Sequence, residues 1–419
     1  MHRLAWFGLA TALWAQAFEG VPQSEYRSRR DALRESISGG LLILFGNAER
    51  ERGELRAGFW QEPNFFYLTG WEEPGAILVM SPGDEALFVP RRDPERERWT
   101  GRKAAPEDAD IRERTGFDRV FATEEFEARL PELIKNASRL YTLTGAPAAE
   151  RLKALLPLRE FTDIAAPLAR LRMKKSAAEI ELIRKATAIT IEAHRAAWRR
   201  LAGGLFEYQL GATAAGVYFE AGCRRHAYAP IVASGPNALT LHYSANRRRI
   251  GADELVLMDV GGECASYAAD ITRTVPVAGR FNERQRELYE IVLGAQKAVI
   301  AAVKPGMTLA RTGPNSLHQI ALEYFSRHRK GPAGEPLDKY FTHGIGHHVG
   351  LEVHDAAEPG RPLEPGMVIT IEPGLYIPEE GIGIRIEDMV LVTEDGAEVL
   401  SAGLPKEPAE IERALAKGG

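Results

Sequence analysis

Cysteine is scarce in this sequence, which contains two, Cys223 and Cys264, among 419 residues. Two cysteines cannot form the framework of several disulfides on which small secreted domains depend. The two could pair in an oxidising compartment, but a free cysteine also behaves as a small apolar side chain and is commonly buried. We therefore expect two buried free thiols rather than a disulfide.

The sequence also lacks a long apolar run in its body and an excess of charge of either sign. Without such a run no transmembrane helix is expected there. A formal net charge of −5 gives no general attraction to nucleic acid or to anionic lipid. We therefore expect neither a nucleic-acid partner nor stable membrane insertion. The hydrophobic fraction of 45% is that of an ordinary globular protein, and 419 residues suffice for two domains.

The first residues of the sequence form an apolar leader. Arg3 precedes an uncharged apolar run over 4–14, and Ala15-Gln16-Ala17 places small residues around a cleavage position. This pattern is typical of a secretory signal peptide; the alternative is an N-terminal helix packed on the first domain. We expect residues 1–17 to be removed and the protein to be exported, either periplasmic or secreted. Without a signal it would be cytoplasmic.

Residues 18–168 are predicted to form an α/β domain. The expected elements are a charged helix over 26–37 and apolar strands over 41–45, 76–80 and 86–89. The segment 59–71 is dense in aromatics, and it either belongs to the core or lines a pocket or a subunit contact. Residues 91–103 are too charged for a core, so an exposed loop with one aromatic, Trp99, is expected there.

Residues 169–419 are predicted to form a second domain with helices outside and strands inside. A linker is expected over 167–176. Long helices are predicted over 177–201, 207–221, 283–303 and 309–328. The strand-like runs between and after these helices contain charged residues, which points to a site built on strands. The overall class is α/β or α+β.

Two aspartates mark the most informative stretch of this domain. The apolar run 255–258 is typical of a buried strand and ends at Asp259, and Asp270 introduces a second strand-like run rich in β-branched residues. Two strands joined by a short turn would bring these carboxylates together. At a few Å they repel by roughly 4 kcal/mol at an effective dielectric near 20. For either residue alone a salt bridge at a turn is the simpler explanation, but the pair calls for a positive charge between them.

Further polar side chains lie downstream where a purely structural protein would not need them. Three histidines fall in the six positions of HGIGHH, 343–348, and His354 follows. Glu372 ends one apolar strand-like run, and Glu387 lies inside another. Either glutamate alone would be explained by a buried salt bridge.

Together these residues predict a site for two divalent cations. The four carboxylates of Asp259, Asp270, Glu372 and Glu387 balance the charge of two such ions, and His347 supplies one imidazole. Oxygen-rich sites with one nitrogen suit Mn²⁺, Co²⁺ or Fe²⁺ better than a structural Zn²⁺. A single-zinc helix is rejected because glycines interrupt the histidine spacing and the Glu of HExxH is missing.

The chemistry expected of such a site is hydrolysis. Two metal ions about 3.5–4 Å apart lower the pKa of a shared water, so a metal-bridged hydroxide is expected to attack a carbonyl carbon. The remaining histidines, His242, His343 and His354, are candidates for stabilising the tetrahedral intermediate and for moving protons.

These motifs resemble those of the creatinase/aminopeptidase family with the pita-bread fold. The family order of Asp, Asp after ten intervening residues, His, Glu and Glu is intact here, and the resemblance covers about residues 170–400. HGIGHHVGLEVHD, ITIEPGLY, IRIEDMVLV and SGPNALTLHY are most similar to Xaa-Pro aminopeptidases (aminopeptidase P), as is FWQEPNFFYLTGWEEPGAILVM in the first domain. The resemblance implies a creatinase-like α/β domain followed by a curved antiparallel sheet flanked by helices.

The resemblance also implies roles for individual residues. His242, His343 and His354 would be catalytic histidines, and His242 and His354 would also bind substrate. Glu372 would bind metal and handle a proton. The family usually uses manganese, with Co²⁺, Fe²⁺ and Zn²⁺ as alternatives.

Three further residues would lie near bound substrate by resemblance. Tyr376 and Arg385 would be near-site residues. Trp99, in a W-x-G-R context, would reach the site of a neighbouring subunit. Members of the family are commonly dimers or tetramers, so a homodimer or homotetramer is expected here.

The function implied is that of an exopeptidase that releases the N-terminal residue from peptides with proline at the second position. One alternative is an Xaa-Pro dipeptidase (prolidase), which shares the five ligands. Another is a non-catalytic peptide-binding module of the same fold, which would have no reason to keep four mutually repelling carboxylates. A creatinase-like hydrolase without metal is disfavoured because no ligand is replaced. The aromatic-rich segment 59–71 favours the aminopeptidase.

Overall fold

The structure, a computed structural model, describes residues 20–37, 39–49 and 58–416. Within these residues the chain divides into two compact units, Val21–Arg172 and Met173 onwards. The predicted signal peptide, 1–17, lies outside the described residues. The linker expected over 167–176 is wrong for most of its length, because α9 spans Ala165–Met173. Pro167 is compatible with this helix because it lies in the first turn, where its missing N–H has no intrahelical partner to lose.

The first unit is built on one six-stranded sheet with the order β4-β3-β2-β1-β5-β6. Its central strand β1 pairs antiparallel with β2 and parallel with β5. One face of the sheet buries Leu41, Ile43, Val79 and Phe88 against Phe126. The strands are β1 Gly40–Phe45, β2 Ile77–Met80, β3 Glu85–Val89, β4 Val120–Ala122, β5 Arg139–Thr142 and β6 Phe161–Asp163.

Helices of this unit decide between the two interpretations of the aromatic segment 59–71 and correct the loop expected over 91–103. Most of the aromatic segment is core, since Phe65, Phe66, Tyr67 and Trp71 are buried. The exposed loop expected over 91–103 instead contains a helix capped by the Asp93 side chain, although none of its residues is buried. The helices are α2 Gln23–Arg34, α4 Pro63–Thr69, α5 Pro94–Thr100, α6 Ile111–Thr115, α7 Phe126–Ile134 and α8 Ala149–Leu155.

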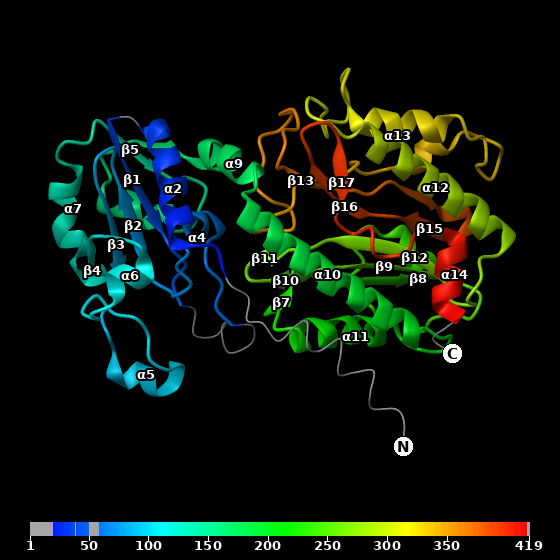
Figure 1. Cartoon of the computed structure of the whole chain (residues 1–419), viewed down its shortest axis with the longest axis horizontal. Helices are drawn as coiled ribbons and strands as arrows, with labels where there is room; N and C mark the ends of the chain where they lie inside the picture. Colours follow the sequence, from blue (N-terminus) through cyan, green and yellow to red (C-terminus); the bar gives the residue numbers. More distant parts are fainter. Residues whose placement is uncertain (1–19, 38, 50–57, 417–419) are drawn as a thin grey trace. The chain divides into compact units, whose positions relative to one another are not determined.

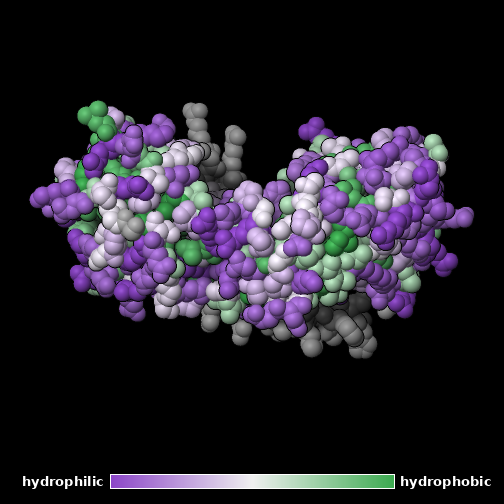
Figure 2. Space-filling model, turned by 90° about the horizontal axis from the view of Figure 1, so that it is seen from above, coloured by the Kyte–Doolittle hydropathy of each residue, from purple (hydrophilic) through white to green (hydrophobic). Residues whose placement is uncertain are grey.

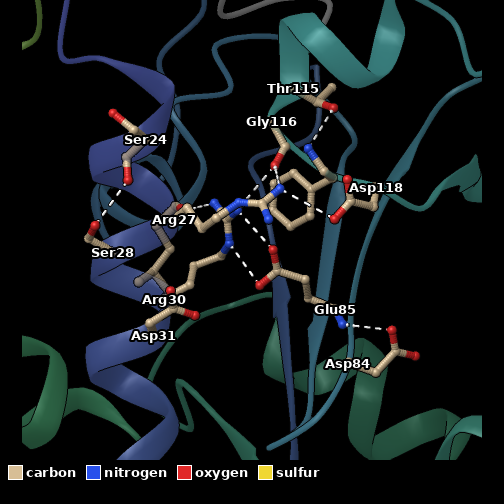
Figure 3. A network of polar contacts seen from close by, with 12 residues as sticks. Ser24, Arg27, Ser28, Arg30, Asp31, Asp84, Glu85, Thr115, Gly116 and Asp118 are labelled. Carbon is tan, nitrogen blue, oxygen red and sulfur yellow. Dashed lines mark hydrogen bonds and ion pairs between the residues drawn. The ribbon is translucent and has the colours of Figure 1, made fainter.

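A buried ion-pair network fastens α2 to the sheet (Figure 3). The Arg30 guanidinium is fully buried and donates hydrogen bonds to both carboxylate oxygens of Glu85, at 3.0 and 2.9 Å. It also donates to the carbonyl of Leu68 and lies 3.9 Å from the centroid of the Phe117 ring. Paired bonds of this kind are among the strongest polar contacts in proteins. They fix the register of α2 on the sheet.

Two antiparallel helices open the second unit. α10 begins with a capping box between Ser176 and Glu179 and buries Ile183, Ala186 and Ile189 on one face, as predicted.

The helix predicted over 309–328 begins at Leu317 instead, because Gly313-Pro314 interrupts the pattern and Ser316 caps the helix. The helices are α10 Ala177–Arg200, α11 Glu207–Glu220, α12 Glu283–Ala302, α13 Leu317–Ser326 and α14 Pro408–Ala416.

Antiparallel strands fill the space between α10 and α11 on one side and α12 and α13 on the other (Figure 1). β9 and β12 pair directly, with Thr272 opposite Asp259. The small hairpin β10–β11 is inserted between them in the sequence, where the sequence suggested a short turn. The strands are β7 Arg225–His226, β8 Ile231–Ser234, β9 Leu255–Val260, β10 Gly262–Cys264, β11 Tyr267–Ala268, β12 Ile271–Pro276, β13 Val368–Ile371, β14 Gly374–Ile377, β15 Ile382–Arg385, β16 Asp388–Val392 and β17 Ala397–Val399.

The expectation of two free thiols is wrong. Cys223 and Cys264 form a disulfide, with Cα atoms 4.3 Å apart. Both residues are buried. They meet because β7, which follows Cys223, pairs with β10, which ends at Cys264. Sequence separation alone could not reveal this pairing of strands.

Two features concern the polarity of the molecule: the apolarity of its helices and the polarity of one face of its surface. Among the described residues, no helix combines the length and the apolarity needed to cross a membrane. The face seen in Figure 2 is mostly hydrophilic, with apolar residues scattered between polar ones.

Candidate metal centre

One cavity of the second unit, of about 450 Å³, contains most of the predicted site residues. Tyr376 lies beside it, with its hydroxyl 2.9 Å from His343 Nε2 and 2.9 Å from Arg385 Nη1. Trp99 does not line the cavity; it belongs to the first unit, on α5, and is 89% exposed. The predicted residues in the lining are His242, Asp259, Asp270, His343, His347, His354, Glu372, Arg385 and Glu387.

Strand ends deliver the four carboxylates. Asp259 lies on β9 and Asp270 directly precedes β12, its antiparallel partner. Glu372 directly follows β13 and Glu387 directly precedes β16, and these two strands also pair. Two strand pairs therefore each contribute two carboxylates, which explains why charged residues interrupt otherwise apolar runs.

The glycines around His347 allow its backbone to pack against β13. A Cβ atom at Gly346 would lie 1.9 Å from the carbonyl oxygen of Thr370, so only glycine fits this position. The Thr370 N–H donates to the His347 carbonyl at 2.9 Å. The Thr370 hydroxyl accepts from the His347 N–H at 3.1 Å. The HGIGHH motif thus holds its second histidine, His347, beside the strand that precedes Glu372.

The imidazole of His347 is oriented as a metal-binding histidine is. Its Nδ1 lies 3.1 Å from the carbonyl of His348, to which it donates a hydrogen bond. Its Nε2 then faces Asp270 Oδ2 at 3.3 Å and Glu372 Oε1 at 3.7 Å. A lone pair aimed at two carboxylates is repulsive unless a proton or a cation lies between them. Metal-ligating histidines usually donate their second ring N–H to a carbonyl or carboxylate in this way.

Tyr228, which the sequence analysis missed, joins the aspartate pair. Its hydroxyl oxygen lies 2.5 Å from Asp259 Oδ1 and 2.5 Å from Asp270 Oδ1. A phenol has one proton, so it can donate to only one of the two oxygens. The other close approach requires a second proton or a cation. No spacing around Tyr228 marks it in the sequence, because pairing of β7 with β10 brings it to the site.

Two other residues support the carboxylates. Thr272 donates its hydroxyl to Glu387 Oε2 at 2.7 Å. Arg385 donates to Asp259 Oδ2 at 2.6 Å and is itself buried. Arg385 was predicted near the site, whereas Thr272 was not, since a threonine in a β-branched strand carries no distinguishing pattern.

The electrostatics of the site favour bound positive charge. Burial raises the pKa of Glu372 to about 7 and that of Glu387 well above its usual range. Burial acts to lower the pKa of His347, but the hydrogen bond to Asp270 and the charges of Asp270 and Glu372 outweigh it and raise that pKa to about 9. Four carboxylates with one arginine thus hold positive charge strongly, either as protons or as metal ions.

The donor set fits divalent cations. Asp270, His347 and Glu387 each offer a ligand atom, and these atoms lie within 4.8 Å of one another. Asp259 and Glu372 line the same cavity beside them. Carboxylate oxygens with a single imidazole are the ligands of a hard, oxygen-preferring ion. The residues that could hold metal are therefore the five named from the sequence.

Three further histidines lie around this centre, and burial favours the neutral form of two of them, His343 and His354. The His354 ring lies 4.1 Å from that of His347, centroid to centroid, and the His242 ring lies 6.5 Å from that of His354. His343 Nδ1 is 2.8 Å from the carbonyl of Gly344. Burial lowers the pKa of His343 to about 3 and also lowers the pKa of His354. Neutral imidazoles can accept or donate one proton at a time.

Comparison with known proteins places this arrangement in a family. Residues 181–394 match the family model of metallopeptidase family M24, and residues 26–141 match that of the aminopeptidase P N-terminal domain. The Xaa-Pro aminopeptidase of Haemophilus influenzae is 35% identical, over 94% of this chain and 98% of its own length. Human Xaa-Pro aminopeptidase 3 is 36% identical, over 94% of this chain and 86% of its own length.

Solved structures of aminopeptidases have the same fold as this chain. The Pseudomonas aeruginosa aminopeptidase PepP superimposes with a TM-score of 0.87 at 34% identity, covering 96% of this chain and 99% of that one. Aminopeptidase P from Escherichia coli with the inhibitor Pro-Leu gives 0.85 at 33% identity, with the same coverage of 96% and 99%. The second unit therefore has the pita-bread fold, and the chain belongs to metallopeptidase family M24, with the N-terminal domain of aminopeptidase P.

Proposed function

We propose that this metallopeptidase is an Xaa-Pro aminopeptidase, which releases the N-terminal residue from peptides with proline at the second position. Relatives that carry this name are about 35% identical over nearly the whole chain. The single observation that carries the proposal is the meeting of the five ligand residues in one cavity beside three histidines.

The metal ions we propose are two Mn²⁺, held by Asp259, Asp270, His347, Glu372 and Glu387. The oxygen-rich donor set supports Mn²⁺, Co²⁺ or Fe²⁺ over a structural zinc. A solved structure described as zinc-substituted E. coli aminopeptidase P indicates that the site of that relative accepts more than one metal. When bound, such a metal pair supplies a water of lowered pKa and polarises the carbonyl under attack.

The protein's own side chains would bind substrate and move protons. His242 and His354 line the open cavity, where we propose that they contact the peptide around the scissile bond. His343 bonds to Tyr376, which in turn receives a hydrogen bond from Arg385. Nε2 of His343 therefore accepts from Tyr376, and the one proton of the ring is on Nδ1, 3.6 Å from Glu372 Oε2. We propose that this Nδ1–H turns from the Gly344 carbonyl to the developing oxyanion when substrate is bound, and that Glu372 carries the transferred proton.

The lining of the cavity favours longer peptides over dipeptides. A prolidase must bind the free carboxylate that directly follows proline, which calls for an unpaired cation. Among the residues that line this cavity, Arg385 is the one lysine or arginine, and it is buried and paired with Asp259. The dipeptidase is therefore the second candidate. A non-catalytic peptide-binding module is the third, and nothing in the donor set favours it.

Hydrolysis of matched peptides tests the proposal. The metal-free enzyme is loaded with Mn²⁺ and given Ala-Pro-Ala, Ala-Pro and Ala-Ala-Ala, and the released alanine is quantified. We expect release from Ala-Pro-Ala and at least tenfold less from the other two. If only Ala-Pro is cleaved, the enzyme is a prolidase. If none of the three peptides is cleaved while metal is bound, the protein is a non-catalytic peptide-binding module.

The location and assembly of the enzyme are also proposals. If residues 1–17 act as a signal peptide, the enzyme works outside the cytoplasm. We further propose a homodimer or homotetramer in which the exposed Trp99 reaches a neighbouring copy. Light scattering tests the assembly, and cell fractionation tests the location.

A further inference from the structure

The disulfide lies in the same substructure as the aspartate pair. Cys264 ends β10, within the stretch of chain that leaves Asp259 and returns at Asp270. Cys223 opens the short segment that passes through β7 and reaches Tyr228. The disulfide therefore ties the segment that carries Tyr228 to the hairpin whose two ends carry the two aspartates.

Continuous contacts join the disulfide to the site. β7 pairs with β10, with Glu263 opposite Arg225, and these two side chains form an ion pair at 2.7 Å. Two residues closer to the site, the Ala227 N–H donates to the Gly261 carbonyl at 2.9 Å. The next residue is Tyr228, whose hydroxyl contacts both aspartates. A shift of β7 against β10 would therefore move the tyrosine against the carboxylates.

The hairpin tip next to Cys264 is held in an unfavourable backbone conformation. Ala265 and Ser266 have φ values of +50° and +67°, as in a two-residue type I′ turn. Residues with a Cβ rarely adopt positive φ, and asparagine or glycine is the usual choice in this turn. Such a turn persists where its surroundings impose it, and the disulfide lies one residue before it.

We propose that Cys223 and Cys264 are positioning residues for the metal centre, so that the oxidised enzyme binds metal more tightly than the reduced one. The inference rests on the metal site of the proposed function. Reduction by a phosphine would break the S–S bond: the phosphine supplies two electrons and water supplies the two protons and an oxygen, which leaves two protein thiols and one phosphine oxide. The β7–β10 contact then loses its covalent link, and Tyr228 loses its fixed place between Asp259 and Asp270.

The proposal also ties the enzyme to a compartment. Structural disulfides persist in oxidising surroundings and are rare in the reducing cytosol. An enzyme whose metal affinity depends on this disulfide would bind metal most tightly outside the cytosol. This agrees with the proposal that residues 1–17 direct the enzyme out of the cytoplasm.

The test compares Mn²⁺ affinity in oxidised protein, in protein reduced with a phosphine, and in the Cys223→Ala/Cys264→Ala variant. Affinity is measured calorimetrically on metal-free protein well below the melting temperature. We expect no free thiols in denatured, unreduced protein, and Mn²⁺ binding weaker by roughly 10- to 100-fold after reduction, the range known for outer-shell partners of metal ligands. Reoxidation should restore the affinity, and the double variant should bind weakly with or without reductant.

A second comparison separates positioning from general stabilisation. In a Tyr228→Phe background, breaking the disulfide should change Mn²⁺ affinity by less than threefold, because the contact that transmits the effect is already gone. Two free thiols in the unreduced protein, or an unchanged Mn²⁺ affinity in both the reduced protein and the double variant, would overturn the proposal. Neither readout requires peptidase activity, so failure here is distinguishable from failure of the proposed function.

Discussion

Single hydroxyl groups hold the carboxylates of the metal centre in place. The Thr272 hydroxyl donates to Glu387 Oε2 at 2.7 Å and accepts from Arg385 Nε at 3.3 Å. It therefore links a predicted metal ligand to the arginine that pairs with Asp259. A hydrogen bond to a charged group contributes about 1.5–3 kcal/mol, more than a bond between neutral groups.

Replacing Thr272 with valine keeps the side-chain shape and removes this hydroxyl. We expect Mn²⁺ affinity to fall at least tenfold, because Glu387 loses the donor that orients it. Isothermal titration of metal-free protein measures the change. Thr393→Val is the matched control, since the Thr393 hydroxyl contacts only Asp395 and Gly396 in its own turn. Equal affinities in the two variants would contradict the role given to Thr272.

His194 makes the stability of the catalytic unit sensitive to acid. It is fully buried on α10, with Nε2 3.0 Å from the Ile271 carbonyl and Nδ1 without a partner. Burial lowers its pKa from 6.5 to about 3. Between these values the unfolded chain binds the proton and the folded chain does not, so the free energy of unfolding falls as the pH drops below 6.5. The loss amounts to about 2 kcal/mol at pH 5.

His194→Gln should remove this share of the acid sensitivity. The free energy of unfolding is measured with urea at pH 7 and at pH 5, for the variant and for the native sequence. The decrease between the two pH values should be about 2 kcal/mol smaller in the variant. The assignment would be wrong if His194→Gln lost as much stability between the two pH values as the unaltered protein.

Among the elements, α12 supports both glutamate-bearing strand ends from behind. Its Gln296 is fully buried, and the side-chain amide nitrogen lies 3.1 Å from the Ile386 carbonyl and 3.4 Å from the Ile371 carbonyl. These residues directly precede Glu387 and Glu372. One helix side chain thus sets the spacing of two predicted ligands.

Gln296→Leu should destabilise the catalytic unit and weaken metal binding together. A buried carbonyl left without its donor costs about 1–3 kcal/mol, and the released strand ends carry two ligands. Chemical unfolding and Mn²⁺ titration measure the two effects. Glu290→Gln, at an exposed position of the same helix, should change unfolding by less than about 0.5 kcal/mol. A variant that lost stability but kept native Mn²⁺ affinity would show that Gln296 does not position the ligands.

The sequence predicted elements well where caps and periodicity agree. α10 was predicted from the helical spacing of its apolar residues, and the structure adds a capping side chain at the start of both α10 and α12, Ser176 and Asn282. α5 was missed because its charged residues, none of which is buried, show no apolar stripe, and the helix depends on the Asp93 cap. The β10–β11 hairpin was missed because its turn residues, Ala265 and Ser266, are not the glycine or asparagine that usually mark such a turn.

For the whole molecule, the two compact units should respond separately to their own ligands and mutations. We expect unfolding in two steps, and saturating Mn²⁺ should raise only the transition of the unit that contains the metal centre. At one hundred times the dissociation constant the gain is about 2.7 kcal/mol. Arg30→Met should lower only the other transition, by about 3 kcal/mol, because Glu85 loses its bidentate partner.

Calorimetric scans with and without Mn²⁺ separate these effects. Arg119→Met serves as the control in the first unit, because the Arg119 pair with Asp84 is exposed and should contribute little. A single transition that moves as a whole with both Mn²⁺ and Arg30→Met would show that the two units unfold together.

The metal ligands of the candidate site could be predicted from the sequence, but the residues that hold these ligands in place could not. Charge balance named the four carboxylates, because buried acids in apolar strands need cations, and the family pattern agreed with them. Tyr228, Thr272 and Gln296 were not predicted, since each reaches the site only through strand or helix pairing that no local pattern encodes. The role of Trp99 stays a prediction, because it concerns a second copy of the chain.

The number of metal ions bound per chain is the decisive measurement for a two-metal centre. Metal-free enzyme and its Asp270→Ala variant are titrated with Mn²⁺, and bound metal is counted per chain after removal of the excess. The native protein should bind two ions. Asp270→Ala should bind at most one and lose peptidase activity, while its first unit stays folded by circular dichroism. Two tightly bound ions and full turnover in Asp270→Ala would show that Asp270 is not a ligand of the catalytic metal ions.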